Sequence, residues 1–218
     1  MLGDILGSLL ARILPGAWEG RVPPITIPGR HGIIDGYLKN NPWVNGDKKS
    51  MLDIGCGFPP YTTLETSASF PDWHITGVDP SLPYYLLHDE AGNYATLDES
   101  KSTTYFQPAI PTIENWNDLL QDSAATKARF EHLLHDMLER PESTNGEFPA
   151  LAINPIKTYE TDNLAFITGK IGEVDIDQKD IIRCFNVLFY FDDKFYESAL
   201  EWFSDQLAEG GLLIIGGN

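Results

Sequence analysis

The spacing of apolar residues changes several times along the chain, and each spacing predicts one kind of element. Short apolar runs predict five strands, at residues 51–54, 73–78, 164–169, 180–191 and 212–217. The fourth run, "DIIRCFNVLFYF", is almost unbroken, which is typical of a strand buried on both faces of a parallel sheet. Between the strands the pattern predicts helices at residues 33–39, 61–69, 113–120 and 123–140, and a last helix that begins after Asp192 and ends at Gly210.

Strands that alternate with helices predict an α/β fold, a doubly wound and mostly parallel Rossmann-like sheet with helices on both faces. The alternation is interrupted at residues 82–162, which contain no clear buried strand. We therefore expect a helical insertion after the second strand, long enough to have its own structure or function. The predicted organisation is an N-terminal helix and irregular lead-in at 1–47, followed by one α/β domain at 48–218 that contains the insertion.

The first fourteen residues, "MLGDILGSLLARIL", have apolar positions at helical spacing before Pro15 and Gly16. A secretory signal peptide would begin with positive charge, whereas the first charged side chain here is Asp4. We expect this helix to pack on the domain, and a surface anchor or a lid over a ligand site are the alternatives.

Composition narrows the class of protein. The 218 residues are 42% hydrophobic, which is enough for a large core, and carry a formal charge of −17. The acidic balance and the lack of a basic run disfavour a nucleic-acid partner. No apolar run is long enough to span a membrane, and the two separated cysteines indicate reduced, buried thiols in a cytoplasmic protein. His132 and His135 lie three residues apart and are expected to be solvated, so no metal site is predicted.

The stretch "KKSMLDIGCGFPP" at residues 48–60 is the candidate ligand-binding turn. Gly55 and Gly57 follow the first strand, where a backbone without Cβ atoms allows close approach of a ligand. Pro60 replaces the third glycine of the dinucleotide fingerprint, and no G-K-[ST] follows for a phosphate loop. Asp53 would repel a pyrophosphate and suits a cationic amino group. Asp79 closes the second strand, where an acid accepts hydrogen bonds from ribose hydroxyls.

The stretches "MLDIGCG" and "ITGVDPS" resemble motif I and the acidic end of the second strand in class I S-adenosylmethionine-dependent methyltransferases. The resemblance covers residues 48–80 and 164–216. It implies S-adenosylmethionine as cofactor, with the glycine turn at its methionine part, an acid at its ribose and the following residues at its adenine. The cofactor-binding residues implied in this way are Asp53, Gly55, Cys56, Gly57, Asp79, Pro80, Ser81, Lys170, Ile171 and Asn186.

A narrower resemblance lies in "IIRCFNVLFYFDD", which is similar to a stretch of the chemotaxis-receptor methyltransferases and implies that Asn186 faces cofactor and acceptor. The chain departs from the larger family at Pro59, where a loose third glycine is usual, and at Lys170, where an acid is frequent. The family also adds an antiparallel pair of strands after the fifth strand, and no such hairpin is evident here. Either the chain is a fragment, or the edge of the last strand is covered by the N-terminal helix, a partner or a second copy.

The resulting hypothesis is an enzyme that transfers a methyl group from S-adenosylmethionine to an oxygen or nitrogen acceptor on a small molecule or protein. No catalytic residue is assigned, because methyl transfer depends mainly on alignment and no general base stands out. The alternative is a catalytically inactive methyltransferase-like scaffold that acts by binding proteins. A nicotinamide-dependent enzyme is a more distant alternative, because of Pro60.

Overall fold

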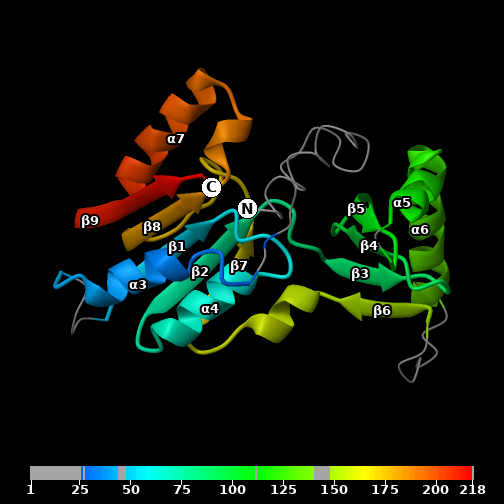
Figure 1. The fold of residues 1–218 in the computed structure, drawn as a ribbon, viewed down its shortest axis with the longest axis horizontal. Helices are drawn as coiled ribbons and strands as arrows, with labels where there is room; N and C mark the ends of the chain where they lie inside the picture. Colours follow the sequence, from blue (N-terminus) through cyan, green and yellow to red (C-terminus); the bar gives the residue numbers. More distant parts are fainter. Residues whose placement is uncertain (1–25, 27, 44–47, 111, 140–147, 218) are drawn as a thin grey trace. The chain divides into compact units, whose positions relative to one another are not determined.

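The computed structural model describes residues 26, 28–43, 48–110, 112–139 and 148–217. The helix predicted for residues 1–14 lies outside these ranges. The chain forms two compact units, one that contains Pro83–Thr158 and one that contains Pro24–Leu82 and Tyr159–Asn218 (Figure 1). Within the described ranges, no helix combines the length and the apolar character that a bilayer crossing needs.

The larger unit contains a five-stranded parallel sheet. Its strands are β1 (Ser50–Ile54), β2 (His74–Asp79), β7 (Leu164–Thr168), β8 (Lys179–Phe185) and β9 (Leu207–Gly216). The strands lie in the order β7-β2-β1-β8-β9, and every neighbouring pair is parallel. The chain therefore builds outward from β1 in one direction and then, from β8, in the other. This places the switch point of the sheet between β1 and β8, where ligands bind in open α/β sheets.

Helices cover both faces of this sheet, which confirms the predicted doubly wound fold (Figure 1). On one face, Leu52 and Ile182 form a core cluster with Phe203 of α7 (Asp193–Gln206). On the other face, α3 (Gly32–Asn40) and α4 (Tyr61–Ser69) supply partners for Asp53 and Arg183. The two sets of strand residues alternate, as the pleat of a strand requires.

The fourth apolar run forms a shorter strand than its apolar pattern predicts, although its end agrees with the position at the mouth of this strand that the resemblance implied for Asn186. β8 ends at Phe185, and a short 3₁₀ turn, η2 (Leu188–Tyr190), follows. The break occurs at Asn186, whose φ of +58° leaves the extended region. Apolar composition alone did not reveal this break, because the turn anchors Leu188 in the core but leaves the next aromatic residues exposed.

The last helix is also shorter than predicted. α7 begins after Asp192, whose carboxylate accepts a hydrogen bond from the Phe195 amide at 2.9 Å, so the predicted cap is confirmed. However, α7 ends at Gln206, and β9 begins at Leu207 rather than after the two glycines. Leu207 pairs with Lys179 of β8, so pairing with the sheet takes precedence over continuation of the helix.

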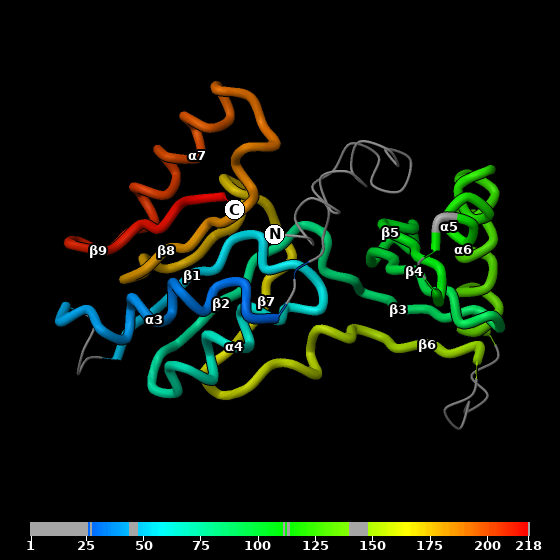
Figure 2. The backbone as a smooth tube through the Cα atoms, in the orientation of Figure 1, coloured from blue at the N-terminus to red at the C-terminus, as the bar shows by residue number. Residues whose placement is uncertain are grey.

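The insertion has strands as well as helices, so the expectation of a helical insertion is wrong. It contains β3 (Tyr85–His88), β4 (Tyr94–Leu97), β5 (Thr103–Gln107), α5 (Ile113–Leu120), α6 (Ser123–Glu139) and β6 (Ala150–Ile153), followed by the 3₁₀ turn η1 (Pro155–Tyr159). The four strands form an antiparallel sheet in the order β5-β4-β3-β6 (Figure 2). The two helices lie where the sequence predicts them.

The core of the insertion explains why its strands were missed. Leu87, Ala95 and Phe106 point to one face of the sheet, where they pack with Phe130 and Leu134 of α6. Each strand has only four or five residues, which is too short for its alternation to be distinguished from a loop. In addition, β6 pairs with β3 across a long stretch of chain, and local patterns do not record such a pairing.

Candidate functional site

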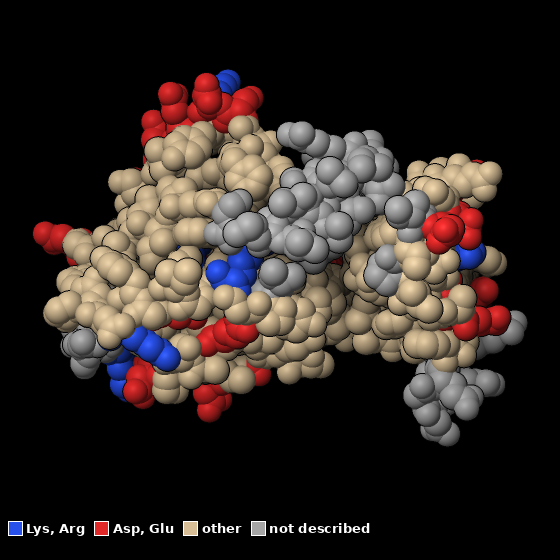
Figure 3. Space-filling model, in the orientation of Figure 1, with Lys and Arg blue, Asp and Glu red and all other residues tan. Residues whose placement is uncertain are grey.

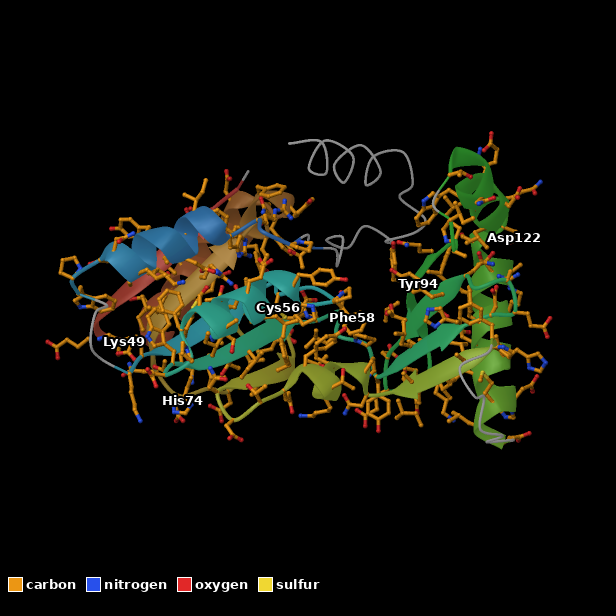
Figure 4. All side chains as sticks on the ribbon, turned by 60° about the horizontal axis from the view of Figure 1, so that its bottom comes forward. Lys49, Cys56, Phe58, His74, Tyr94 and Asp122 are labelled. Carbon is orange, nitrogen blue, oxygen red and sulfur yellow. The ribbon has the colours of Figure 1, made fainter. Side chains whose placement is uncertain are left out.

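The turn between β1 and α4 has a backbone that only glycine adopts readily. Gly55 has a φ of +76° and Gly57 a φ of +68°. A Cβ atom on Gly55 would collide with the Cγ2 atom of Val187, which lies just after β8. Figure 4 labels Cys56 and Phe58 on this turn. The glycines therefore bring the turn against the segment that follows β8, on the other side of the switch point.

The amides of the turn are already engaged by the end of β2. The Gly55 amide donates to the Val78 carbonyl oxygen at 2.8 Å, and the Cys56 amide lies 3.4 Å from the same atom. The Gly57 amide donates to Oδ2 of Asp79 at 3.0 Å. A phosphate-binding loop points such amides at the ligand, so this turn is not built to hold a phosphate.

Asp79 is the buried acid at the carboxyl end of β2. Its other oxygen, Oδ1, accepts a hydrogen bond from the Ser81 amide at 2.7 Å. Burial raises the pKa of Asp79, and the hydrogen bonds from the Ser81 and Gly57 amides oppose this rise. Each carboxylate oxygen has two lone pairs, so Asp79 retains acceptor capacity beyond these two bonds. The next residue, Pro80, is exposed, and Ser81 is half-buried.

Asp53 lies in the core, with a partner from the chain itself. The Arg183 guanidinium binds both of its oxygens, with Nε to Oδ1 at 2.8 Å and Nη2 to Oδ2 at 2.7 Å. The Thr63 hydroxyl donates to Oδ2 at 2.6 Å. Burial opposes ionisation of Asp53, but the adjacent guanidinium outweighs it and lowers the pKa of the carboxyl. The carboxylate predicted to hold a ligand's amino group is thus occupied by a side chain of β8.

This ion pair is part of a buried network that joins four elements. Nη1 of Arg183 lies 3.3 Å from Oδ1 of Asp35 on α3 and 2.9 Å from the Thr66 hydroxyl on α4. Arg183 is fully buried, with 0% of its surface exposed. Burial raises the pKa of Asp35, whereas Arg183 lowers it. The network fixes β1 and β8 to each other directly below the ends from which the glycine turn and Asn186 emerge.

His31, the residue before α3, borders the same network. Its ring lies 5.4 Å from that of Phe185 at the end of β8, in an edge-on arrangement. Its Nδ1 atom is buried and has no hydrogen-bond partner among the described residues. Burial and the charge of Arg183 lower the pKa of His31 to about 4, so the ring is neutral at pH 7.

Asn186 is the first residue beyond β8, beside the end of β9. Its amide donates to the Gly216 carbonyl oxygen at 2.8 Å. A Cβ atom built on Gly217 would lie 3.6 Å from the Asn186 Oδ1 atom and 3.4 Å from the Phe189 ring. Asn186 and Phe189 therefore flank one point at the carboxyl edge of the sheet. The next residue, Val187, packs against Gly55 of the glycine turn, so the turn lies close to this point.

The turn after β7 is tied to the site through its backbone. The Gly169 amide donates to the Asp79 carbonyl oxygen at 3.3 Å. Beyond it, the exposed Lys170 ammonium lies 3.7 Å from a carboxylate oxygen of Glu173. Ile171 packs against the core cluster on the α7 side of the sheet. Of these two predicted adenine contacts, one side chain is in solvent and the other is turned toward the core.

Cys56 would contribute backbone rather than its side chain to a ligand at this turn. Its side chain is buried and points toward Gly77 of β2, where a Cβ atom would lie 3.2 Å from the sulfur. Burial raises the pKa of Cys56 well above its ordinary value and that of Cys184 to about 12. Both thiols are therefore protonated at neutral pH and behave as small apolar groups.

The two histidines of α6 are on its exposed surface, as expected. His132 lies 3.7 Å from Asp136, and His135 lies 3.6 Å from Glu139, both at the four-residue spacing of neighbours on a helix. Each histidine thus has its own acidic neighbour.

Sequence reasoning placed the glycine turn, Asp79 and Asn186 at one edge of the sheet, and the structure brings them together there. It missed the partnership of Arg183 with Asp53. An arginine inside the apolar run "DIIRCFN" was a usable signal, because a buried charge requires a buried partner. It also missed the burial of His31, because the contact of this ring with Phe185 of β8 joins segments far apart in the chain.

Comparison of the sequence with protein-family models and with curated proteins gives no match. Solved structures with similar folds include an N-methyltransferase, NodS, from Bradyrhizobium japonicum (12% identity, TM-score 0.40, 86% of this chain and 62% of that one). Another is an O-methyltransferase family protein from Burkholderia thailandensis (11%, 0.40, 97% and 40%). A third is coclaurine N-methyltransferase bound to N-methylheliamine and SAH (14%, 0.39, 84% and 34%). The chain thus spans between about a third and two thirds of their lengths. The larger unit has a Rossmann-like fold.

Proposed function

We propose that this chain binds S-adenosylmethionine and is part of a methyltransferase that acts on an oxygen or nitrogen acceptor. The observation that carries the proposal is the direction of the turn amides after β1. They donate to Val78 and Asp79 at the end of β2, so the turn pairs with an acid instead of presenting donors to a phosphate. A nucleoside without phosphates matches this arrangement, whereas a dinucleotide or a nucleoside triphosphate does not.

Asp79 would hold the ribose of the cofactor. Its carboxylate is fixed by two backbone amides and has lone pairs left for the two ribose hydroxyls. The second carboxylate of the region, Asp53, is left out of the ligand set because Arg183 and Thr63 occupy it. The glycine turn would contribute close backbone contact, since both glycines keep its surface free of side chains.

When bound, S-adenosylmethionine would supply an electrophilic methyl group on its sulfonium, and the oxygen or nitrogen acceptor would take this group and release a proton. The protein's task is to align the acceptor with that methyl group. Asn186 is suited to this, because it lies at the end of β8, across the switch point from Asp79. Its position is fixed by the hydrogen bond that its backbone amide donates to the Gly216 carbonyl oxygen.

Calorimetric titration with S-adenosylhomocysteine, the demethylated product, tests the proposal. Binding is expected, and Asp79→Ala should weaken it by about 1–3 kcal/mol because charge-assisted hydrogen bonds are lost. Asp72→Ala is the matched control, since Asp72 is exposed and precedes the opposite end of β2. NAD⁺ and ATP should not bind. Binding of NAD⁺ at the expense of S-adenosylhomocysteine, or equal affinity in the Asp79 and Asp72 variants, would refute the assignment.

The pH dependence of the same titration gives a second test. Ribose hydroxyls donate to an ionised carboxylate, so affinity should fall as pH falls through the pKa of Asp79. Burial raises this pKa, and the loss should therefore begin at a higher pH than for an ordinary aspartate. Asp79→Asn removes the titrating group, so its weaker binding should not change over this pH range.

A further inference from the structure

Three consecutive aromatic side chains are exposed just beyond the end of β8. Phe189, Tyr190 and Phe191, here called the aromatic patch, are 60%, 41% and 43% exposed. The residue before them, Leu188, is buried in the core beneath α7 and anchors the turn. The turn is closed by amides of Tyr190 and Phe191 that donate to Val187 and Leu188 at 3.1 Å. The backbone of the turn therefore sets where the three rings emerge, and the Phe191 ring stacks on that of Phe195 of α7, with centroids 4.3 Å apart.

The aromatic patch adjoins the proposed cofactor site. The Phe189 ring and the Asn186 Oδ1 atom both lie within 4 Å of one point at Gly217, which places this ring at the carboxyl edge of the sheet. Val187, two residues earlier, fills the space above Gly55 of the cofactor turn. The rings of Phe189 and Tyr190 lie 4.2 Å apart. Exposed apolar groups concentrated at one place mark an interaction site, and this place is the predicted position of the acceptor.

Size and charge indicate the kind of occupant. Three side chains are a small area compared with the ~1,200 Å² or more that a stable protein interface buries in total. A planar aromatic molecule can stack on such rings with little loss of conformational freedom. The patch leads directly into α7 through its N-cap residue, Asp192, and its first residue, Asp193. Acidic side chains gather over this helix at the top of Figure 3. This field disfavours an anion and favours a neutral or cationic ligand.

We propose that the aromatic patch binds the methyl acceptor, and that the acceptor is a small planar aromatic molecule without negative charge. The identification as acceptor rests on the proposed methyltransferase function, whereas the binding of aromatic ligands does not. Phe189 is the central ring, because it is the one that adjoins Asn186.

The test uses three naphthalene probes of one size and different charge: 2-naphthol, 2-naphthylmethylamine and 2-naphthoate. Their binding to the full 218-residue chain is measured by calorimetry at pH 7.5, with and without saturating S-adenosylhomocysteine. The neutral and cationic probes should bind, and the anion should bind weakest. Phe189→Ala should weaken 2-naphthol by roughly ten- to a hundredfold, as loss of a stacking aromatic does.

Tyr37→Ala is the matched control, because Tyr37 is 62% exposed, close to the 60% of Phe189, and belongs to α3, which covers the face of the sheet opposite α7. It should leave 2-naphthol binding unchanged. This proposal would be overturned, and the proposed function would stand, if the chain bound S-adenosylhomocysteine but none of the probes. Equal losses of 2-naphthol affinity in the two variants would have the same meaning. Binding of 2-naphthol that depends on Phe189, without binding of S-adenosylhomocysteine, would keep the aromatic site and refute the proposed function. A dimer abolished by Phe189→Ala, with no probe bound, would assign the patch to a second copy instead.

Discussion

The buried pair of Arg183 and Asp53 makes a strong prediction about stability. Arg183→Met keeps most of the side-chain length but removes the guanidinium from a site with 0% exposure. Asp53 then loses two hydrogen bonds, of 2.7 and 2.8 Å, and its only described cationic partner. Asp35 loses the same cation. The variant is left with two buried carboxyl groups, and in the described part of the chain their remaining side-chain donors are Thr63 and Thr66.

Removal of one partner from a buried ion pair costs about 3–5 kcal/mol, because the other charge stays buried without compensation. This is a large share of the roughly 5–15 kcal/mol that holds a domain folded. Replacement of both partners by apolar residues of similar size is often close to neutral. The double variant Asp53→Leu, Arg183→Met should therefore recover most of the loss, since the raised pKa of Asp35 allows it to remain as a neutral acid.

Urea unfolding followed by circular dichroism measures these differences. A control is Arg129→Met, which breaks the half-exposed pair of Arg129 and Asp89 and should cost at most about 1 kcal/mol. The direction in which stability changes with pH gives an independent test. In the natural chain the pKa of Asp53 is lowered, so its contribution is present at neutral pH and is lost as pH falls through the folded pKa. In Arg183→Met the buried acid has a raised pKa, and stability should rise as pH falls.

A double variant no more stable than Arg183→Met would refute this reasoning, because it would show that lost packing and not unpaired charge causes the damage. A single variant that costs no more than Arg129→Met would show that water or a rearranged donor reaches the carboxylates.

Three further predictions concern the same region. Gly55→Ala should destabilise the chain by about 1–2 kcal/mol or more, measured by urea unfolding, because its φ is +76° and Val187 occupies the Cβ position; Gly36→Ala, in an open position on α3, should be neutral or stabilising. Asp192→Ala should lower stability by ~0.5–2 kcal/mol through loss of the cap of α7, and Asp192→Asn should retain most of it, which thermal unfolding can check. His31 has a folded pKa of about 4, below its unfolded value, so stability should fall by roughly 3 kcal/mol between pH 6.5 and 4. His31→Asn should abolish that part of the pH dependence, and an unchanged urea-midpoint profile would contradict the burial of the neutral ring.

The sequence alone determined the architecture of the larger unit. Its strands recur as short apolar runs, and the glycine turn and Asp79 follow two of them, so the edge of the parallel sheet that holds the candidate site could be located without coordinates. The helix cap at Asp192 could also be predicted from the sequence, because it depends on one side chain and one nearby backbone amide. These features share a physical basis, since each depends on residues close together in the chain.

Only the tertiary structure decided the partners of the buried charges and the boundaries of the elements. Asp53 and Arg183 are 130 residues apart, so nothing local indicates that the acid before the glycine turn is neutralised from within. The end of β8 at Phe185, the early start of β9 and the strand pairing of β3 with β6 likewise depend on contacts between distant segments. The exposure of the aromatic patch follows from the end of β8, because the three rings come after that point. A residue's burial depends on where its strand ends, and an apolar run gives no signal of that point.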